Sequence, residues 1–269
     1  MKTSALLTLS SLFLLLAGCG DSGSTSAPQA SAPSPAAPAA APAAKAGYQA
    51  MATVADAGTL SGTVSYAGDK TDANVTITKD KTACVLHGGK DERPADALIA
   101  TDGKLKNVVV WLDGVQSGKA WDIDTIEIDN KDCKFVPHVS IGKVGGMLAA
   151  KNSDPVLHNT HLFLKQGNKN LVNIALPQQG QVIEKKLKKK GIVDVKCDAH
   201  EWMQAYIFVA DNPYAAVTGD DGSFTMADVP AGEYTLKMWH ETLGSHETTV
   251  TVTAGGATTA DADAATFSS

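Results

Sequence analysis

The sequence predicts an all-β protein built from β-sandwiches, and three observations support this fold class. Short runs rich in Val, Ile and Thr recur through residues 55–256, and this composition is typical of strands. Turn residues such as Asp102-Gly103 and Gly219-Asp220 separate these runs at close spacing. No segment shows sustained helical periodicity, because Lys185–Lys190 is too short and too polar to form an amphipathic helix. We therefore expect sandwiches or a small barrel.

The expected strands are short and each is dominated by β-branched or aromatic residues. Examples, in chain order, are Ser61–Tyr66, Asn107–Leu112, Ile192–Lys196, Ala205–Val209, Tyr234–Met238 and Thr248–Val252.

The N-terminus predicts export and a lipid anchor. Lys2 precedes an apolar stretch, Leu6–Leu16, that is too short to remain as a membrane-spanning helix, and this order is typical of a secretory signal. The run Leu16-Ala17-Gly18-Cys19 resembles the lipobox of bacterial lipoproteins. That resemblance implies that residues 1–18 are removed and that Cys19 is diacylated. Gly20 then favours the outer membrane, with the protein facing the periplasm. The alternative is an ordinary signal peptide in which Cys19 has no such role.

Composition predicts unstructured segments at both ends of the chain and argues against one class of binding partner. Residues 19–54 would be the lipidated Cys and an Ala/Pro/Ser tether, which is too poor in apolar residues to order itself. Residues 257–269 would be a disordered tail. The formal net charge of −6 argues against nucleic acid as a partner. The basic run Lys185–Lys190 is interpreted as a solvated turn.

Two separated motifs suggest a metal centre. The first is Asn152-Ser153-Asp154-Pro155-Val156-Leu157-His158-Asn159, and the second is Cys197-Asp198-Ala199-His200-Glu201-Trp202-Met203. Together they resemble the cupredoxins, and in particular the plastocyanin- and amicyanin-like members. The resemblance implies a Greek-key β-sandwich over residues 121–209. It also implies one mononuclear, type 1-like copper ion bound by His158, Cys197, His200 and Met203.

Ligand chemistry explains the residue types in these motifs. Two imidazoles and a thiolate with a weak axial thioether form the blue-copper arrangement. Zinc also binds Cys and His, but Met is a poor zinc ligand. The resemblance assigns supporting roles to Asn159, which would tether the Cys loop. We interpret Trp202 as a packing anchor that excludes water.

The remaining candidates are two histidines and two cysteines. His161 lies three residues after His158, so on a strand it faces the opposite side and is interpreted as a packed or surface residue. His138 could be an extra ligand. With Cys19 lipidated and Cys197 on the metal, Cys84 and Cys133 remain, and an oxidising compartment favours a disulfide between them.

A second resemblance concerns the segments on either side of residues 121–209. Gly58–Val64 precedes them, and Asp221–Phe224 and Val229–Leu236 follow. These segments resemble the transthyretin-like, Ig-like sandwich called the carboxypeptidase regulatory-like domain. The implied domain has a first part at 55–120 and a second part at 210–256. One sandwich would be inserted in the other or would share strands with it. Two tandem domains are the alternative.

The expected function is one-electron transfer between redox partners in the cell envelope, and no enzyme activity is expected. A copper storage or delivery protein would use the same ligands. A third alternative is a metal-free binding module of the envelope. A nucleophilic Cys–His enzyme is disfavoured, because the sequence offers no further support for an orienting acid and an oxyanion hole.

Overall fold

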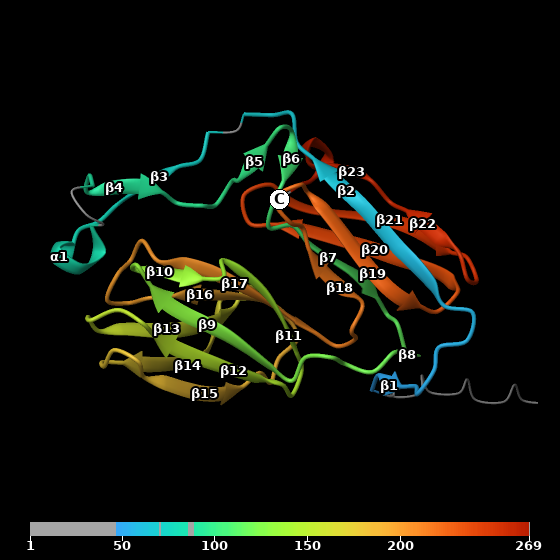
Figure 1. Ribbon diagram of the computed structural model, residues 1–269, viewed down its shortest axis with the longest axis horizontal. Helices are drawn as coiled ribbons and strands as arrows, with labels where there is room; N and C mark the ends of the chain where they lie inside the picture. The colour runs from blue at the N-terminus through green and yellow to red at the C-terminus, as the bar shows by residue number, and fades with distance from the viewer. Residues whose placement is uncertain (1–46, 70, 86–88, 269) are drawn as a thin grey trace, which may run out of the picture. The chain divides into compact units, whose positions relative to one another are not determined.

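The computed structural model describes residues 47–69, 71–85 and 89–268, so the lipobox and Cys19 lie outside the described residues. Nearly all of the regular elements in this part of the chain are strands (Figure 1). Its helical elements are one turn of α-helix, α1 (Lys81–Cys84), and one 3₁₀ turn, η1 (Ala264–Thr266). The predicted all-β fold class is confirmed. None of the helices among the described residues is long and apolar enough to cross a membrane.

The larger sandwich has two facing sheets. One has the strand order β10-β9-β12-β15 and the other the order β11-β17-β16-β13-β14. Pairing is antiparallel except for β9 with β12 and β11 with β17, which are parallel. The strands are β9 (Thr125–Lys131), β10 (Lys134–Val136), β11 (Val139–Lys143), β12 (Met147–Asn152), β13 (His158–Leu164), β14 (Lys169–Leu176), β15 (Val182–Lys186), β16 (Gly191–Lys196) and β17 (Gln204–Ala210).

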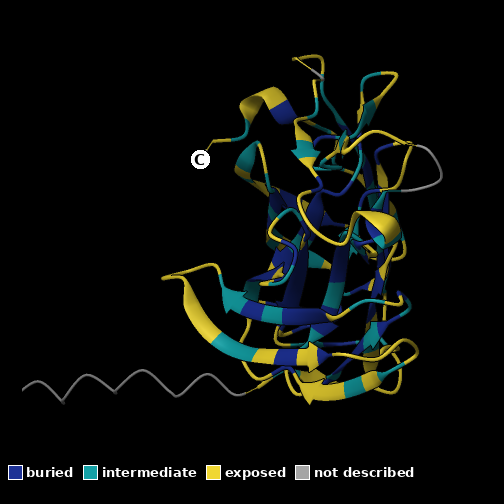
Figure 2. Cartoon of the chain, turned by 90° about the vertical axis from the view of Figure 1, so that its left-hand side faces the viewer, coloured by how far each residue is buried: buried dark blue, intermediate teal, exposed yellow. Residues whose placement is uncertain are grey.

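Both sheets contribute to one apolar core. Ile128 and Leu148 of the first sheet pack in the same buried cluster as Leu162, Val193 and Ile207 of the second sheet. The buried positions run through the strands, whereas the turns are exposed (Figure 2). A shared core between two sheets is what makes this region a sandwich.

The smaller sandwich combines strands from both sides of the larger one. One sheet has the order β18-β7-β20-β21, and the other has the order β19-β2-β6-β5, with β22 and β23 also on β2. Its core includes Leu60, Leu112, Phe224 and Leu236. The strands are β2 (Gly58–Ser65), β5 (Ala100–Thr101), β6 (Lys104–Leu105), β7 (Val109–Asp113), β18 (Ala215–Val217), β19 (Ser223–Val229), β20 (Gly232–His240), β21 (Gly244–Val252), β22 (Ala257–Thr259) and β23 (Ala262–Asp263).

Strand β17 explains how the two cores meet. Ile207 faces the core of the larger sandwich, whereas Tyr206 and Phe208 belong to a third apolar cluster that includes Val109 and Trp239 of the smaller sandwich. Six of the seven β17 residues are buried. A strand that is covered on both faces needs a continuous apolar run, and the sequence from Ala205 to Ala210 supplies one.

An additional segment lies between β2 and β6. It contains a two-stranded hairpin of β3 (Asn74–Thr76) and β4 (Glu92–Pro94), with α1 between them. Ile77 and Cys84 of this segment are buried in the core of the larger sandwich. The remaining short pair is β1 (Gln49–Ala50) with β8 (Ser117–Gly118). The hairpin segment matters because it places Asp80 next to His200.

Candidate metal centre

The four expected ligands gather at one end of the larger sandwich. His158 is the first residue of β13, and Cys197 directly follows β16. His200 and Met203 lie in the turn between β16 and β17. Both histidines are fully buried, and Cys197 and Met203 are each 2% exposed. Side chains at the ends of paired strands are held by the sheet, so the site is built on a rigid scaffold.

Three donor atoms form a compact triangle. The Cys197 sulfur lies 3.8 Å from His158 Nδ1 and 3.7 Å from His200 Nδ1, and the two nitrogens lie 2.9 Å apart. A point equidistant from the three atoms is about 2.0 Å from each, close to the ~2.0 Å metal–nitrogen and ~2.3 Å metal–sulfur distances of protein sites. The donor set therefore fits one metal ion that accepts two imidazoles and a thiolate.

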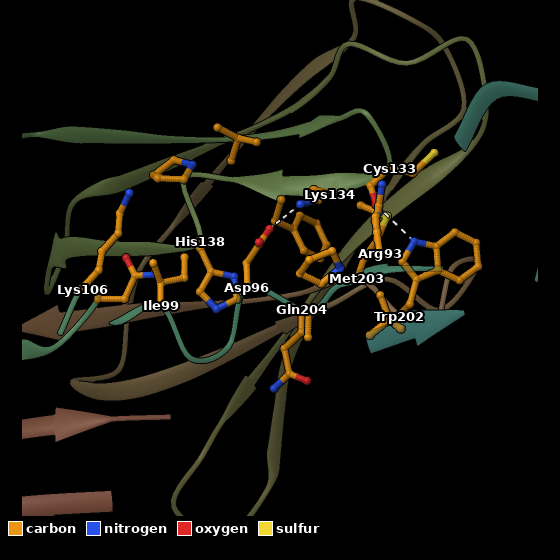
Figure 3. A pocket seen from close by; sticks show the side chains of 17 residues that line it. Arg93, Asp96, Ile99, Lys106, Cys133, Lys134, His138, Trp202, Met203 and Gln204 are labelled. Atoms are coloured by element: carbon orange, nitrogen blue, oxygen red, sulfur yellow. Dashed lines mark hydrogen bonds and ion pairs between the residues drawn. The ribbon is translucent and has the colours of Figure 1, made fainter. Parts of the chain in front are cut away.

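Met203 closes the ligand turn. Its backbone N–H donates to the His200 carbonyl at 2.9 Å, and its side chain packs in the same apolar core as Cys197. Met203 and Trp202 also line a cavity of about 390 Å³ that extends to His138 (Figure 3). Met203 therefore lies at the boundary between the core and this cavity.

Hydrogen bonds favour the ionised thiol. Burial raises the pKa of Cys197, but hydrogen bonds from His158, His200 and the Asn159 amide outweigh burial and lower it to about 6. Burial lowers the pKa of His158, but its contacts with Asp154 and Cys197 outweigh burial and raise it to about 9. A thiolate is the form that binds a metal, so the site stabilises the form it needs.

Asn159 holds the cysteine loop against β13, the role that the cupredoxin resemblance implies. Its side-chain oxygen accepts hydrogen bonds from the Asp198 amide at 2.8 Å and from the Ala199 amide at 3.2 Å. Its backbone N–H lies 3.5 Å from the Cys197 sulfur. Asn159 thus links the strand that carries His158 to the loop that carries Cys197 and His200.

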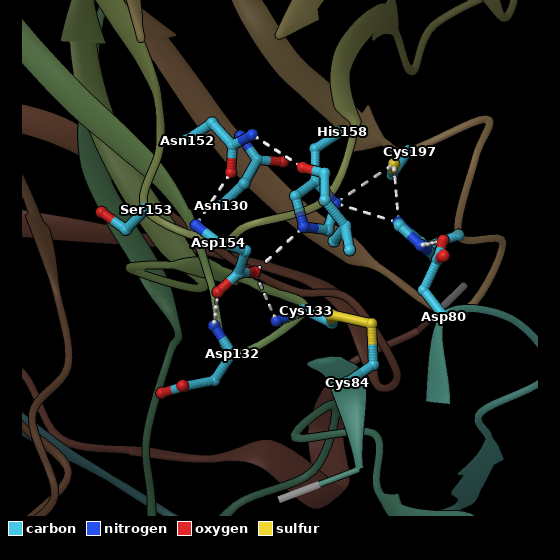
Figure 4. Close-up of polar contacts among 12 residues, drawn as sticks. Asp80, Cys84, Asn130, Asp132, Cys133, Asn152, Ser153, Asp154, His158 and Cys197 are labelled. Atoms are coloured by element: carbon cyan, nitrogen blue, oxygen red, sulfur yellow. Dashed lines mark hydrogen bonds and ion pairs between the residues drawn. A yellow bond between two sulfur atoms is a disulfide. The ribbon is translucent and has the colours of Figure 1, made fainter. Parts of the chain in front are cut away.

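Two carboxylates that sequence reasoning missed bind the outer nitrogens of the histidines. Asp154 Oδ2 lies 2.9 Å from His158 Nε2, and Asp80 Oδ2 lies 2.9 Å from His200 Nε2 (Figure 4). Asp154 could have been found from its place in the motif before His158. No local signal identifies Asp80, which is 120 residues from His200 in the sequence.

The expected cysteine pair is joined in the structure. Cys84 and Cys133 form a disulfide, with their Cα atoms 5.2 Å apart, whereas Cys197 is free. Trp202 lies beside this bond, because its indole N–H donates to the Cys133 carbonyl at 3.2 Å. Its ring centroid is 4.9 Å from that of His200. Trp202 therefore packs between the disulfide and a ligand.

The structure does not bring the other two candidate histidines into the donor triangle. His138 pairs with Glu241, and its ring contacts Tyr206 edge-on. His161 Nδ1 lies 3.0 Å from Asp198, on the outer side of the loop. Strand alternation explains the second case, since residues three apart on β13 face opposite sides.

Comparisons with known proteins give weak similarities. No curated protein matches the chain. Residues 185–260 match a family model described as polysaccharide lyase family 4, domain II. The matching family is therefore not the carboxypeptidase regulatory-like domain that the sequence resemblance implied. The motifs used for that resemblance are turn glycines, a Pro and short strands, which many small sandwiches need for backbone reasons, so they do not separate one family from another.

Solved structures of copper proteins are similar to about a third of the chain. A copper-containing nitrite reductase from Thermus scotoductus is 22% identical, with a TM-score of 0.30, and the match covers 34% of this chain and 24% of that enzyme. Amicyanin from Paracoccus versutus is 17% identical, with a TM-score of 0.29 and coverage of 33% and 86%. A purple cupredoxin from Nitrosopumilus maritimus is 21% identical, with a TM-score of 0.27 and coverage of 31% and 98%.

This chain thus spans only about a quarter of the nitrite reductase. The interpretation of the site rests on donor geometry and not on these neighbours. With two facing sheets of mixed pairing, and buried donors that converge at one end of their shared core, the larger sandwich has a cupredoxin-like fold.

Proposed function

We propose that this protein is a one-electron carrier with a single mononuclear copper ion bound by His158, Cys197 and His200. Met203 would be the weak axial ligand. The observation that carries this proposal is the buried triangle of two imidazole nitrogens and one thiol sulfur. Copper bound to such a set supplies reversible one-electron chemistry, and a rigid, buried site keeps the ligands in place in both oxidation states.

The chain's own residues provide that rigidity. The Cys197 thiolate is stabilised by neighbouring N–H groups, and Asn159 fixes its loop. The apolar core around Cys197 and Met203 excludes water from the inner side of the site. Each of these features limits how far the donor atoms can move, and small movement is what rapid electron transfer requires.

The alternatives fit the burial less well. A storage or delivery protein must release its ion, whereas the two histidines here are fully buried and Cys197 is 2% exposed. Cys197, His158 and Asp154 are also arranged as in a cysteine hydrolase triad. The same burial leaves a substrate no access to the sulfur, so we propose a carrier and not an enzyme. Its redox partner would be another envelope protein, and neither nucleic acid nor a small substrate is proposed.

The test is copper content together with the visible spectrum of the purified chain. We expect one copper per chain and an intense thiolate-to-copper band. Cys197→Ala should remove the band while the sandwiches remain folded, because the donors lie at one end of a core that packs without a metal. A storage site would give copper without the strong band. A parent chain that binds no stoichiometric copper would exclude both copper functions.

A further inference from the structure

We propose that Asp80 and Asp154 are positioning residues of the metal centre and that the Cys84–Cys133 disulfide fixes both carboxylates. This inference rests on the proposed copper function, and it identifies what aims the two histidines. In both cases the ring nitrogen that faces away from Cys197 is bonded to a carboxylate oxygen at 2.9 Å.

Asp154 is held by the backbone beside one half of the disulfide. The Cys133 N–H donates to Asp154 Oδ2 at 2.8 Å, and the Asp132 N–H donates to Oδ1 at 2.8 Å. The side-chain oxygen of Asn152 accepts from the Asp154 N–H at 2.9 Å. Asp154 is only 7% exposed, and these hydrogen bonds hold its carboxylate in the observed orientation. That orientation presents Oδ2 to His158.

Asp80 is held by the other half of the disulfide. Its carbonyl accepts the N–H groups of Ala83 and Cys84, each at 2.9 Å. Asp80 is the N-cap residue of α1, yet its side chain makes no capping hydrogen bond. Asp at an N-cap ordinarily stabilises the helix through such a bond. Here the carboxylate is directed to His200 instead, and the backbone adopts a left-handed φ of 47°.

The disulfide therefore joins two separate arms of the same site. Cys133 belongs to the turn after β9 in the larger sandwich, and Cys84 belongs to the hairpin segment outside its sheets, 49 residues away in sequence. Each cysteine donates its backbone N–H to one of the two aspartates. Figure 4 shows Asp154 on one side of His158 and Asp80 on the other side, below Cys197.

The chemical effect is to fix which nitrogen of each histidine keeps its proton. A carboxylate that accepts the Nε2–H holds the proton there, so Nδ1, which faces the Cys197 sulfur, is the nitrogen that releases its proton when an ion binds. Both Nδ1 atoms must be unprotonated to bind an ion. Losing such a carboxylate typically weakens metal affinity by about 10- to 100-fold.

The test compares Asp80→Ala and Asp80→Asn with Asp91→Ala in the purified full chain. Asp91 belongs to the same segment, and among the described residues its side chain pairs only with the exposed Lys81, so it is the matched control. Copper affinity is measured by competition with a chelator of known affinity, together with the spectrum of the bound copper. We expect about a 10- to 100-fold loss for Asp80→Ala. Asp80→Asn should recover part of this loss, because its amide oxygen can still accept the Nε2–H, and Asp91→Ala should match the parent.

The role of the disulfide is tested with Cys84→Ala/Cys133→Ala. If the bond acts through Asp80, adding Asp80→Ala to this variant should reduce copper affinity by much less than it does in the parent, since the two changes remove one interaction. Full additivity would overturn the coupling. The Asp80 variants keep the bond intact, so they test the positioning role even where the cysteine variant fails to fold.

A metal-free measurement separates this inference from the copper proposal. Nitrogen NMR of the histidine rings should show a fully protonated His200 Nε2 in the parent, whereas in Asp80→Ala the proton should be shared between Nε2 and Nδ1. That result supports the positioning role even where the parent binds no copper, an outcome that would remove only the proposed function. Equal tautomer populations and equal copper affinities in parent and Asp80→Ala would overturn it.

Discussion

At the scale of single residues, Met203 is the proposed ligand whose removal should be tolerated. We expect Met203→Leu to retain copper and the thiolate band, because the axial bond is weak and Leu has a similar volume. The reduction potential should shift, since the axial ligand tunes it. Voltammetry of the parent and of Met203→Leu tests this, with the buried Met226→Leu of the smaller sandwich as control. Loss of copper from Met203→Leu would contradict a weak axial role.

His240 should make the protein sensitive to acid. Its side chain is buried, the Thr242 N–H donates to its Nδ1, and its Nε2 has no hydrogen-bond partner among the described residues. Burial, and then the nearby His138, lower the pKa of His240 to about 4. Between pH 6.5 and that value, the unfolded chain binds a proton that the folded chain does not. His240 therefore does not lower the unfolding free energy above pH 6.5. As the pH drops from 6.5 to about 4, this group lowers the unfolding free energy by about 1.4 kcal/mol per pH unit.

Chemical unfolding across this pH range measures the effect. His240→Phe should flatten the dependence of the unfolding free energy on pH, because it removes the group that titrates only in the unfolded state. His246→Phe, at a partly exposed position in β21, should keep the slope of the parent. Identical slopes for the parent and His240→Phe would show that other groups carry the acid sensitivity.

At the scale of elements, Asn159 joins β13 to the loop between β16 and β17. Asn159→Ala would leave the Asp198 and Ala199 amides without their acceptor. We expect a loss of about 1–3 kcal/mol in unfolding free energy and a broader visible band from a less ordered site. Urea unfolding and the copper spectrum measure the two effects. Asn74→Ala, in the exposed part of β3, should change neither. If Asn159→Ala has the unfolding free energy and copper spectrum of the parent, Asn159 does not tether the loop.

The same loop shows how local a signal must be for the sequence to reveal it. Cys197, His200 and Met203 fall within seven residues, and this spacing carried the cupredoxin resemblance that implied a common site. His158 was assigned from a motif on a separate strand. Asp80 had no such signal, because its contact with His200 depends on how a distant hairpin segment packs and on a disulfide. The positions of the expected strands were predicted well, since alternation and turn residues are local, but their ends differ from those observed by up to four residues, as at Thr248 for Gly244 in β21.

At the scale of the whole molecule, the predicted anchor lies outside the described residues. We expect Cys19→Ser to move the protein from the membrane fraction to the soluble fraction of the envelope, because the Leu16–Cys19 motif would no longer supply a lipidation site. Fractionation followed by immunodetection measures this. Cys197→Ser is the control, since it removes a thiol from the folded part and should leave the membrane association unchanged. Membrane retention of Cys19→Ser would contradict the anchor.

The smaller sandwich shows the limit of resemblance for a whole domain. Its Gly- and Pro-containing turns were predicted as part of a sandwich, and β19, β20 and β21 do form one with β2 and β7. The carboxypeptidase regulatory-like family was not supported, because the family model that matches residues 185–260 is a different one. Turns in many small sandwiches need the same Gly and Pro residues for backbone reasons, so these residues do not identify a family.

Under the proposed copper function, the bond between Cys84 and Cys133 would also set an order of maturation. A newly made chain carries three thiols in its folded part, and all of them are soft donors that attract copper. Only after two of these thiols have been oxidised to each other does the chain offer a single thiolate together with its two aligned imidazoles. Sulfur oxidation would thus precede metal insertion during maturation. Copper that arrives too early would meet competing thiols, and the oxidised chain would be the form that accepts the ion correctly.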